Sequence, residues 1–176
     1  MNEIGENMKS NIVLIGFMGT GKSAVGSRLA QQLKKQFVDM DREIENVTGM
    51  SIPEIFKRYG ELRFRSEEKL MARKLSEREN MVIATGGGFV LLEENIEALR
   101  ANGVLICLDA SPEEIFNRVS RKKGSRPLLK KGTTLEDIQA LLQERELSYA
   151  CADIRINTSG RELDQVIREI IEALRY

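Results

Sequence analysis

Residues 16–23 read Gly16-Phe17-Met18-Gly19-Thr20-Gly21-Lys22-Ser23, and the interpretation of the whole chain starts from this stretch. It follows an apolar run at residues 12–15 and precedes residues 24–30, where apolar side chains recur at helical spacing. A strand, a glycine-rich loop and a helix in this order form the context of a phosphate-binding loop, or P-loop. The glycines allow the positive φ angles that turn backbone N–H groups toward an anion, and the helix N-terminus adds partial positive charge.

Two side chains of this loop suit phosphate chemistry. Lys22 is long enough to reach the β- and γ-phosphates of a nucleoside triphosphate, and the Ser23 hydroxyl is able to hold Mg²⁺. A plain glycine-rich turn is the alternative, but chance gives two glycines and Lys-Ser at this spacing in roughly one chain in a hundred or fewer. We therefore predict a nucleotide site at Gly19, Thr20, Gly21, Lys22, Ser23 and Ala24.

The composition narrows the possible chemistry. The 176 residues are 41% hydrophobic and 31% charged with a formal net charge of zero, so we expect no nucleic acid or membrane as a partner. No apolar run approaches the roughly 20 residues that span a bilayer, and residues 1–10 lack a signal-peptide pattern. Two cysteines suggest no disulfide framework, so we expect a cytoplasmic monomer. The chain has no histidine, and a general base must therefore come from the carboxylates.

Short apolar runs separated by helical patterns predict an α/β fold. The runs lie at residues 11–15, 36–38, 81–84, 104–108 and 153–157. Their alternation with helices is typical of a parallel sheet covered on both faces. No interdomain linker interrupts residues 1–176, so we predict one domain, with residues 1–8 as a loose tail.

Local signals mark helix starts and one helix break. Serines followed three residues later by glutamate occur at Ser51, Ser111 and Ser159, and each pair predicts a capping box at a helix start. Gly60 is expected to end a short helix over residues 52–59, and a longer helix is expected over residues 61–78.

Two carboxylates are expected beside the P-loop. Asp39 and Asp41 alternate along the end of the second strand, so their side chains should share one side of an extended chain. The carboxyl ends of parallel strands face the ligand crevice, where magnesium and an acceptor hydroxyl each need a carboxylate. A pair of polar residues that begins a loop is the alternative interpretation.

The end of the third strand carries glycines in place of a carboxylate. Many P-loop proteins have an aspartate there that holds Mg²⁺, whereas this chain continues Thr85-Gly86-Gly87-Gly88. We therefore assign the magnesium role to Asp39. A ligand that approaches the backbone explains the glycines, and a flexible turn explains them equally well.

Arginines and a cationic segment have two interpretations each. Arg65 and Glu68 share a helix face, so Glu68 is able to orient the guanidinium, and Arg65 and Arg145 are able to converge on one carboxylate. Ordinary surface arginines are the alternative.

Residues 121–134 contain six cations and two glycines, which fits a mobile lid over phosphates or a solvated loop. A nucleic-acid patch is disfavoured because there is one cluster and no nearby aromatic residue.

Taken together, these motifs resemble those of the shikimate kinase family. The matching segments are residues 16–23, Asp39-Met40-Asp41, residues 64–68, Thr85-Gly86-Gly87-Gly88, Arg126-Pro127-Leu128-Leu129 and Glu144-Arg145. The resemblance runs from about residue 11 to the C-terminus, and the combination is specific although the P-loop alone is not. It implies the nucleoside monophosphate kinase fold: three α/β/α layers, a five-stranded parallel sheet in the order 2-3-1-4-5, a lid at residues 121–134 and a substrate-binding segment at residues 39–80. The implied reaction is phosphorylation of shikimate by ATP to 3-phosphoshikimate, in aromatic amino-acid biosynthesis.

The resemblance also implies roles on the nucleotide side. Lys22 and Arg126 would neutralise the phosphoryl group during transfer, and Ser23 with Asp39 would hold Mg²⁺. The loop after the last strand lacks the proline that packs on adenine in some members, so Arg121 is named as the residue that stacks on the adenine.

On the acceptor side, Asp41 would bind the ring hydroxyls and serve as the base, or orient the attacking hydroxyl. Arg65 and Arg145 would grip the carboxylate of the acceptor, with Glu68 holding Arg65. Gly87 would contact the acceptor through its backbone.

Two other classes of function remain open. Another small-molecule kinase is one, although gluconate kinases normally carry a histidine in the substrate loop and nucleoside monophosphate kinases a proline in the P-loop, and this chain has neither. The other is a nucleotide-binding regulatory module. A GTPase would show Asn-Lys-x-Asp, which does not occur here, whereas a non-catalytic relative of the kinases would keep the same pattern.

Overall fold

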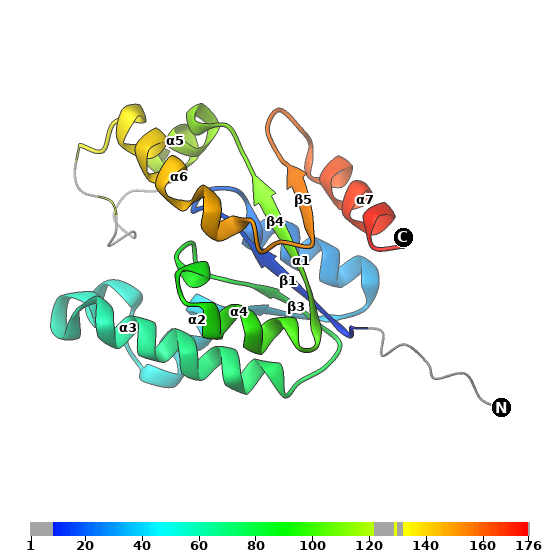
Figure 1. Cartoon of the computed structure of the whole chain (residues 1–176), viewed down its shortest axis with the longest axis horizontal. Coiled ribbons are helices and arrows are strands. Elements are labelled where there is room, and N and C mark those ends of the chain that lie inside the picture. Colours follow the sequence, from blue (N-terminus) through cyan, green and yellow to red (C-terminus); the bar gives the residue numbers. More distant parts are fainter. Residues whose placement is uncertain (1–8, 122–128, 130–131, 176) are drawn as a thin grey trace.

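Five parallel strands form a sheet in the order β2-β3-β1-β4-β5 (Figure 1). The computed structural model describes residues 9–121, 129 and 132–175; the predicted tail at residues 1–8 lies outside them. The elements are β1 (Asn11–Ile15), α1 (Lys22–Leu33), β2 (Gln36–Asp39), α2 (Met40–Thr48), α3 (Ile52–Ser76), β3 (Met81–Ala84), the 3₁₀ turn η1 (Phe89–Leu91), α4 (Glu93–Arg100), β4 (Gly103–Asp109), α5 (Pro112–Arg121), α6 (Leu135–Tyr149), β5 (Ile154–Asn157) and α7 (Leu163–Ala173).

The predicted strands, their parallel pairing and the order 2-3-1-4-5 are all confirmed. β1 lies in the middle of the sheet, where Ile12 pairs with Val82 of β3 on one side and with Val104 of β4 on the other. Every residue of β1 is buried. A parallel strand covered on both faces has no polar side, and this is why its sequence is a continuous apolar run after Asn11.

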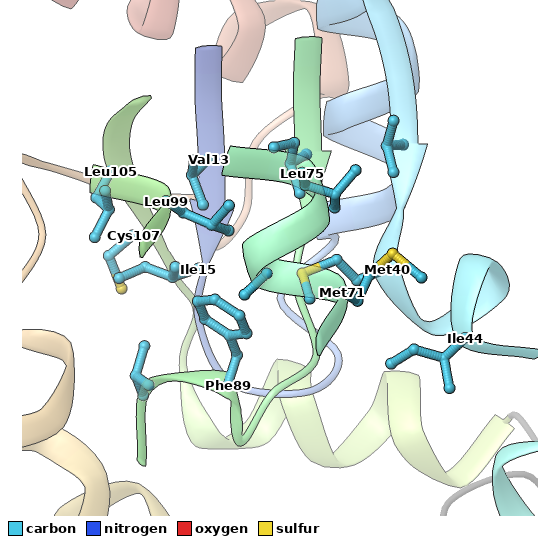
Figure 2. Packing of buried hydrophobic residues seen from close by; sticks show 14 of the residues in the cluster. Val13, Ile15, Met40, Ile44, Met71, Leu75, Phe89, Leu99, Leu105 and Cys107 are labelled. Atoms are coloured by element: carbon cyan, nitrogen blue, oxygen red, sulfur yellow. The ribbon is translucent and has the colours of Figure 1, made fainter. Parts of the chain in front are cut away.

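Alternating side chains of the strands build two separate cores. Ile12 and Leu14 of β1 pack in a cluster with buried residues of α1 and α7. Val13 and Ile15 point to the opposite face, where α3, α4 and the end of α6 contribute to the cluster (Figure 2). The predicted α/β/α layering is therefore confirmed, and it holds the carboxyl ends of the strands at one rigid edge.

That edge is where the functional loops gather. β1 leads into the P-loop, β2 into Asp39 and α2, and β3 into the glycine run. In Figure 1, α5 and α6 lie on one side of this end of the sheet and the start of α3 lies on the other. Loops that are far apart in the sequence thereby face one space.

A glycine bends α3, as predicted. Gly60 has φ 81° and ψ 178°, which is not helical, and helix resumes after it to end at Ser76 rather than at residue 78. A residue with a Cβ adopts this positive φ only with strain. The bend allows the short part before Gly60 and the long part after it to face the same space.

The capping predictions have three different outcomes. The reciprocal box of Ser51 and Glu54 forms at the start of α3. At Ser111 only half of the box forms: the Glu114 N–H donates to Ser111 Oγ at 3.3 Å, whereas the Ser111 N–H donates to Ser159 Oγ.

The helix start predicted at Ser159 is wrong. α7 begins at Leu163, and Glu162 forms the capping box with Gln165. Gly160, with φ 64°, keeps the chain out of the helix at this point. Its N–H donates to Glu114 of α5, a partner that local sequence does not reveal.

Among the described residues, none of the helices combines the length and the apolar character needed to cross a membrane. Both cysteines, Cys107 and Cys151, are free.

Candidate active site

A pocket of about 610 Å³ lies at the carboxyl end of the strands. It is lined by the P-loop and the start of α1, by the end of β2 and the first turn of α2, by one side of α3, by the glycine run after β3 and by the end of α5. This volume is within the usual range for small-molecule sites. The predicted site residues that the pocket brings together are Gly19, Gly21, Lys22, Ser23, Ala24, Asp39, Asp41, Arg65, Gly87 and Arg121.

The P-loop has the backbone conformation that its glycines predict. Gly19 and Gly21 have φ angles of 80° and 96°, and Gly21 is the residue that caps the N-terminus of α1. A Cβ on Gly21 would meet no atom within 4 Å, so the left-handed backbone, and not crowding, requires glycine there. The first amides of α1 are left facing the pocket, where an anion binds favourably.

Lys22 folds back across the loop. Its Nζ donates to the carbonyl oxygens of Gly16 at 2.7 Å and Phe17 at 2.8 Å, and the residue is buried. Thr20 is buried too, and its hydroxyl donates to the Phe17 carbonyl at 2.8 Å. The side chain of Thr20 therefore braces the loop from behind, so only its backbone is available for the predicted contact with nucleotide.

Ser23 and Asp39 bring a hydroxyl and a carboxylate together at the pocket. The Ser23 hydroxyl donates to Asp39 Oδ2 at 2.6 Å, although the two residues belong to different elements. Asp39 also caps α2, where its Oδ1 accepts from the Arg42 N–H at 3.4 Å, so the carboxylate is held in place. A hydroxyl and one carboxylate fit Mg²⁺, which keeps several waters and takes further oxygens from phosphates.

Asp41 lines the pocket from a helix and not from the predicted extended strand. β2 ends at Asp39, and Asp41 lies in the first turn of α2, so the expectation that the two alternate along an extended chain is wrong. Both still line the pocket because α2 starts at the edge of the sheet. Asp41 Oδ1 is buried and has no hydrogen-bond partner among the described residues. Burial, with a smaller contribution from the negative charge of Asp39, raises the pKa of Asp41 to about 6, while Lys22 opposes the shift.

Glu68 is a second buried carboxylate on the acceptor side. It is 1% exposed, and its Oε1 has no hydrogen-bond partner in the described part of the chain. Burial raises the pKa of Glu68 to about 7; the guanidinium of Arg65 opposes the shift and the charge of Asp41 adds to it. A Cβ on Gly86 would lie 2.9 Å from Glu68 Oε1 and 3.2 Å from Asp41 Oδ1. The two unpartnered oxygens therefore face the same side of Gly86.

Arg65 is held at the pocket by two carboxylates of its own helix. Nη1 donates to Glu68 Oε2 at 2.6 Å and Nη2 donates to Glu61 Oε1 at 3.0 Å, so the predicted pairing of Arg65 with Glu68 is confirmed. The guanidinium presses on the glycine run, because a Cβ on Gly88 would lie 2.5 Å from its Nη2. A Cβ on Gly87 would lie 3.1 Å from the backbone nitrogen of Met18. The three glycines therefore leave room for neighbouring groups, which neither of the two sequence-based explanations anticipated.

Arg145 is not among the residues that line this pocket. It lies on α6, is 8% exposed, and its guanidinium carbon is 5.6 Å from the centroid of the Phe17 ring. Its Nη1 is buried and has no hydrogen-bond partner among the residues described. The convergence of Arg145 with Arg65 thus remains a prediction. Arg126 and most of the segment at residues 121–134 lie outside the described residues.

Two residues of the site were not predicted from the sequence. Arg118 lines the pocket, where its Nη1 donates to the Gly19 carbonyl at 3.1 Å and its Nη2 to Glu114 at 2.6 Å. Its position three residues before Arg121 on the same helix was a signal that both share a face. The Tyr149 hydroxyl donates to the Gly87 carbonyl at 2.9 Å, a contact that no local pattern predicts.

This chain is similar in sequence and in shape to known shikimate kinases. The sequence model of the family described as shikimate kinase matches residues 18–175. The shikimate kinase of Pelotomaculum thermopropionicum is 56% identical over 165 residues, which are 94% of this chain and 95% of the relative. The solved structure of shikimate kinase from Acinetobacter baumannii in complex with shikimate has a TM-score of 0.90 and 35% identity, and covers 96% of this chain and 94% of that one. The shikimate kinase of Aquifex aeolicus gives a TM-score of 0.81 and 39% identity, with 94% and 96% covered.

Proposed function

The chain belongs to the shikimate kinase family, and from this membership we propose that it transfers the γ-phosphoryl group of ATP to a hydroxyl of shikimate, giving 3-phosphoshikimate and ADP. One observation carries the proposal for these particular residues. The buried, unpartnered oxygen of Asp41 shares a pocket with the P-loop, with the Ser23–Asp39 pair and with Arg65. A proton acceptor, a phosphate site and a carboxylate-binding cation are thus available to one bound pair of substrates.

On the nucleotide side, the P-loop amides and Lys22 would bind the β- and γ-phosphates. Ser23 Oγ and the Asp39 carboxylate would hold Mg²⁺, which supplies positive charge to the phosphate oxygens. Arg118 and Arg121 both line the pocket and would bind the remainder of the nucleotide. The stacking of Arg121 on adenine stays a prediction.

On the acceptor side, Arg65 would bind the carboxylate of shikimate through paired hydrogen bonds. Asp41 would accept a hydrogen bond from the attacking hydroxyl. As that oxygen bonds to the γ-phosphorus, its proton passes to Asp41 and the bond to the bridging oxygen of ADP breaks. A base with a pKa of about 6 is ionised at neutral pH and still basic enough to take the proton. The role of Arg126 in neutralising the phosphoryl group stays a prediction on a residue outside those described.

An assay of ADP release tests the function directly. The purified protein is supplied with ATP and Mg²⁺ and with shikimate, quinate, gluconate or AMP in separate reactions. We expect ADP release to depend on shikimate and to be far slower with the other acceptors. Faster release with gluconate or AMP would favour the other small-molecule kinases, and no release with any acceptor would favour a regulatory relative.

The magnesium assignment has its own test in Asp39→Asn. The amide keeps the shape and the cap of α2 but removes a charge from the Ser23–Asp39 pair, so metal affinity should fall while the fold remains. We expect turnover to fall and to be partly restored by raised Mg²⁺ concentration, measured as activity against metal concentration. A variant that does not respond to Mg²⁺ would contradict a role of Asp39 in metal binding.

A further inference from the structure

Tyr149, the last residue of α6, is a buried polar group that the proposed reaction does not use. It is 2% exposed, and its ring belongs to the same hydrophobic cluster as Val13 and Phe17. Its hydroxyl donates to the Gly87 carbonyl at 2.9 Å. Gly87 lines the pocket, whereas α6 approaches from the opposite side of the sheet edge to α3 (Figure 1). One hydrogen bond therefore joins the last turn of α6 to the glycine run.

The same hydroxyl lies against Arg145, one helical turn earlier on α6. Residues four apart share a helix face, and the positive charge of Arg145 acts on the phenolic oxygen. Burial raises the pKa of Tyr149, and the positive charge of Arg145 only partly opposes this, so the hydroxyl keeps its proton. It is then able to accept from the arginine and donate to Gly87 at the same time.

The guanidinium also lies near the ring of Phe17. Its centroid is 5.6 Å from the guanidinium carbon, a distance at which a cation is attracted to an aromatic face. The Arg145 Nη1 is buried and has no hydrogen-bond partner among the described residues. A buried charged donor without a partner is costly, and an anion that accepts from it removes that cost.

We propose that Tyr149 is a positioning residue for the acceptor: its hydroxyl ties the Arg145 guanidinium to the Gly87 carbonyl, so that the carboxylate-binding arginine and the glycine run keep one fixed relative position. The inference rests on the proposed function and on the sequence-based prediction that Arg145 joins Arg65 in binding the carboxylate of the acceptor. It assigns to Tyr149 an effect on acceptor binding alone, transmitted through Arg145.

The test is Tyr149→Phe, which keeps the ring in the core and removes only the hydroxyl. We expect the KM for shikimate to rise about tenfold, the effect of losing one hydrogen bond to a charged group, with kcat and the KM for ATP near the wild-type values. The matched control is Tyr59→Phe, because Tyr59 is an exposed tyrosine of α3, and its KM values should not change.

Two further measurements separate positioning from a loss of packing. The carboxamide of shikimate has no negative charge for Arg145 to bind, so Tyr149→Phe should bind it as well as the wild type does. In an Arg145→Lys background, Tyr149→Phe should add little to the rise in KM, because the two residues act together.

Three outcomes would overturn the inference: unchanged KM values, equal rises in the KM for shikimate and for ATP, or an equal penalty on the carboxamide. Wild-type turnover of shikimate is measured separately and tests the proposed function. If the wild type phosphorylates shikimate and the Tyr149→Phe variant is unaffected, the role of Tyr149 is overturned and the proposed function stands.

Discussion

The two glycine-rich loops of the pocket follow neighbouring strands, yet Gly21 of the first and Gly88 of the second need to be glycine for opposite reasons. In the P-loop, Gly21 has φ 96° and open space around its missing Cβ, so the backbone conformation excludes other residues. In the run after β3, Gly88 has φ −99°, which any residue adopts, but a Cβ would lie 2.5 Å from Arg65. In the proposed function, the first loop would bind phosphate through backbone amides. The second loop gives space to Arg65, Asp41 and Glu68, the side chains proposed to serve the acceptor.

This difference has a consequence for substitutions. Strain at a positive φ is a property of the folded backbone and lowers stability wherever it occurs. A Cβ that meets the tip of a flexible side chain moves that tip at little cost to the fold. Substitutions in the P-loop should therefore lower stability and nucleotide binding, whereas substitutions at Gly86 and Gly88 should change acceptor chemistry in a protein that remains stable.

The largest effect is expected where the second loop gives space to the base. Asp41→Asn keeps the shape of the side chain and removes the proton acceptor, and loss of a general base typically lowers the rate by about 10²–10⁴. We predict a fall in kcat of that size, with the affinity for ATP nearly unchanged by calorimetric titration. Near-normal turnover of this variant would show that Asp41 is not the base.

Adding a single methyl group in the second loop should have the next largest effect. Gly86→Ala places a Cβ against the free oxygens of Asp41 and Glu68, and Gly88→Ala places one against the guanidinium of Arg65. We predict that Gly86→Ala mainly lowers kcat, and that Gly88→Ala mainly raises the KM for shikimate.

Arg65→Lys provides the matched comparison for Gly88→Ala. It removes the paired geometry of the guanidinium, and we expect it to weaken acceptor binding by about 1.5–3 kcal/mol. Melting temperatures of both glycine variants should stay close to that of the wild type. A large fall in melting temperature would mean that these glycines serve the fold and would remove the contrast between the loops.

The P-loop provides the opposite case in Gly21→Ala. The methyl group meets no atom within 4 Å, so its cost is the left-handed backbone, about 1–2 kcal/mol of stability. The control is Gly49→Ala, because Gly49 has φ 67°, equally open space and no place in the pocket lining. We predict similar losses in the free energy of unfolding for both, with weakened ATP binding in Gly21→Ala alone. Weakened ATP binding in both variants would show that the P-loop glycine is not special.

The smallest expected effect is on stability as a function of pH. The pKa values of Asp41 and Glu68 are raised by burial to about 6 and about 7, so the folded protein binds their protons more tightly than the unfolded chain does. Their contribution to stability is full below the unfolded values near 4 and is lost progressively as pH rises from about 4 through the folded values of about 6 and 7. We predict that melting temperature decreases over this range, and that the decrease is smaller in Glu68→Gln. An equal pH dependence in that variant would contradict the raised pKa of Glu68.

Several parts of the molecule were predictable because their signals are local. The strands at residues 11–15 and 81–84, the P-loop and the bend at Gly60 each rest on a few adjacent residues whose backbone preferences or apolar pattern determine the local structure. The wrong prediction of a helix start at Ser159 came from a contact with a residue distant in the sequence. At Ser159 the local capping signal was present, but Gly160 and its bond to Glu114 shifted the start of α7.

By itself, the sequence determined the α/β fold and the conformation of the P-loop, because a strand, a glycine loop and a helix are adjacent in the chain and need no distant partner. Only the tertiary structure decided which residues of distant elements meet on the other side of the pocket. Asp41, Glu68, Gly86 and Arg145 come from four separate elements, and their spacing in the chain carries no information on which of them touch. In the packed layers, Asp41 and Glu68 face Gly86 and Arg145 lies near Phe17, because dense packing restricts the position of each side chain.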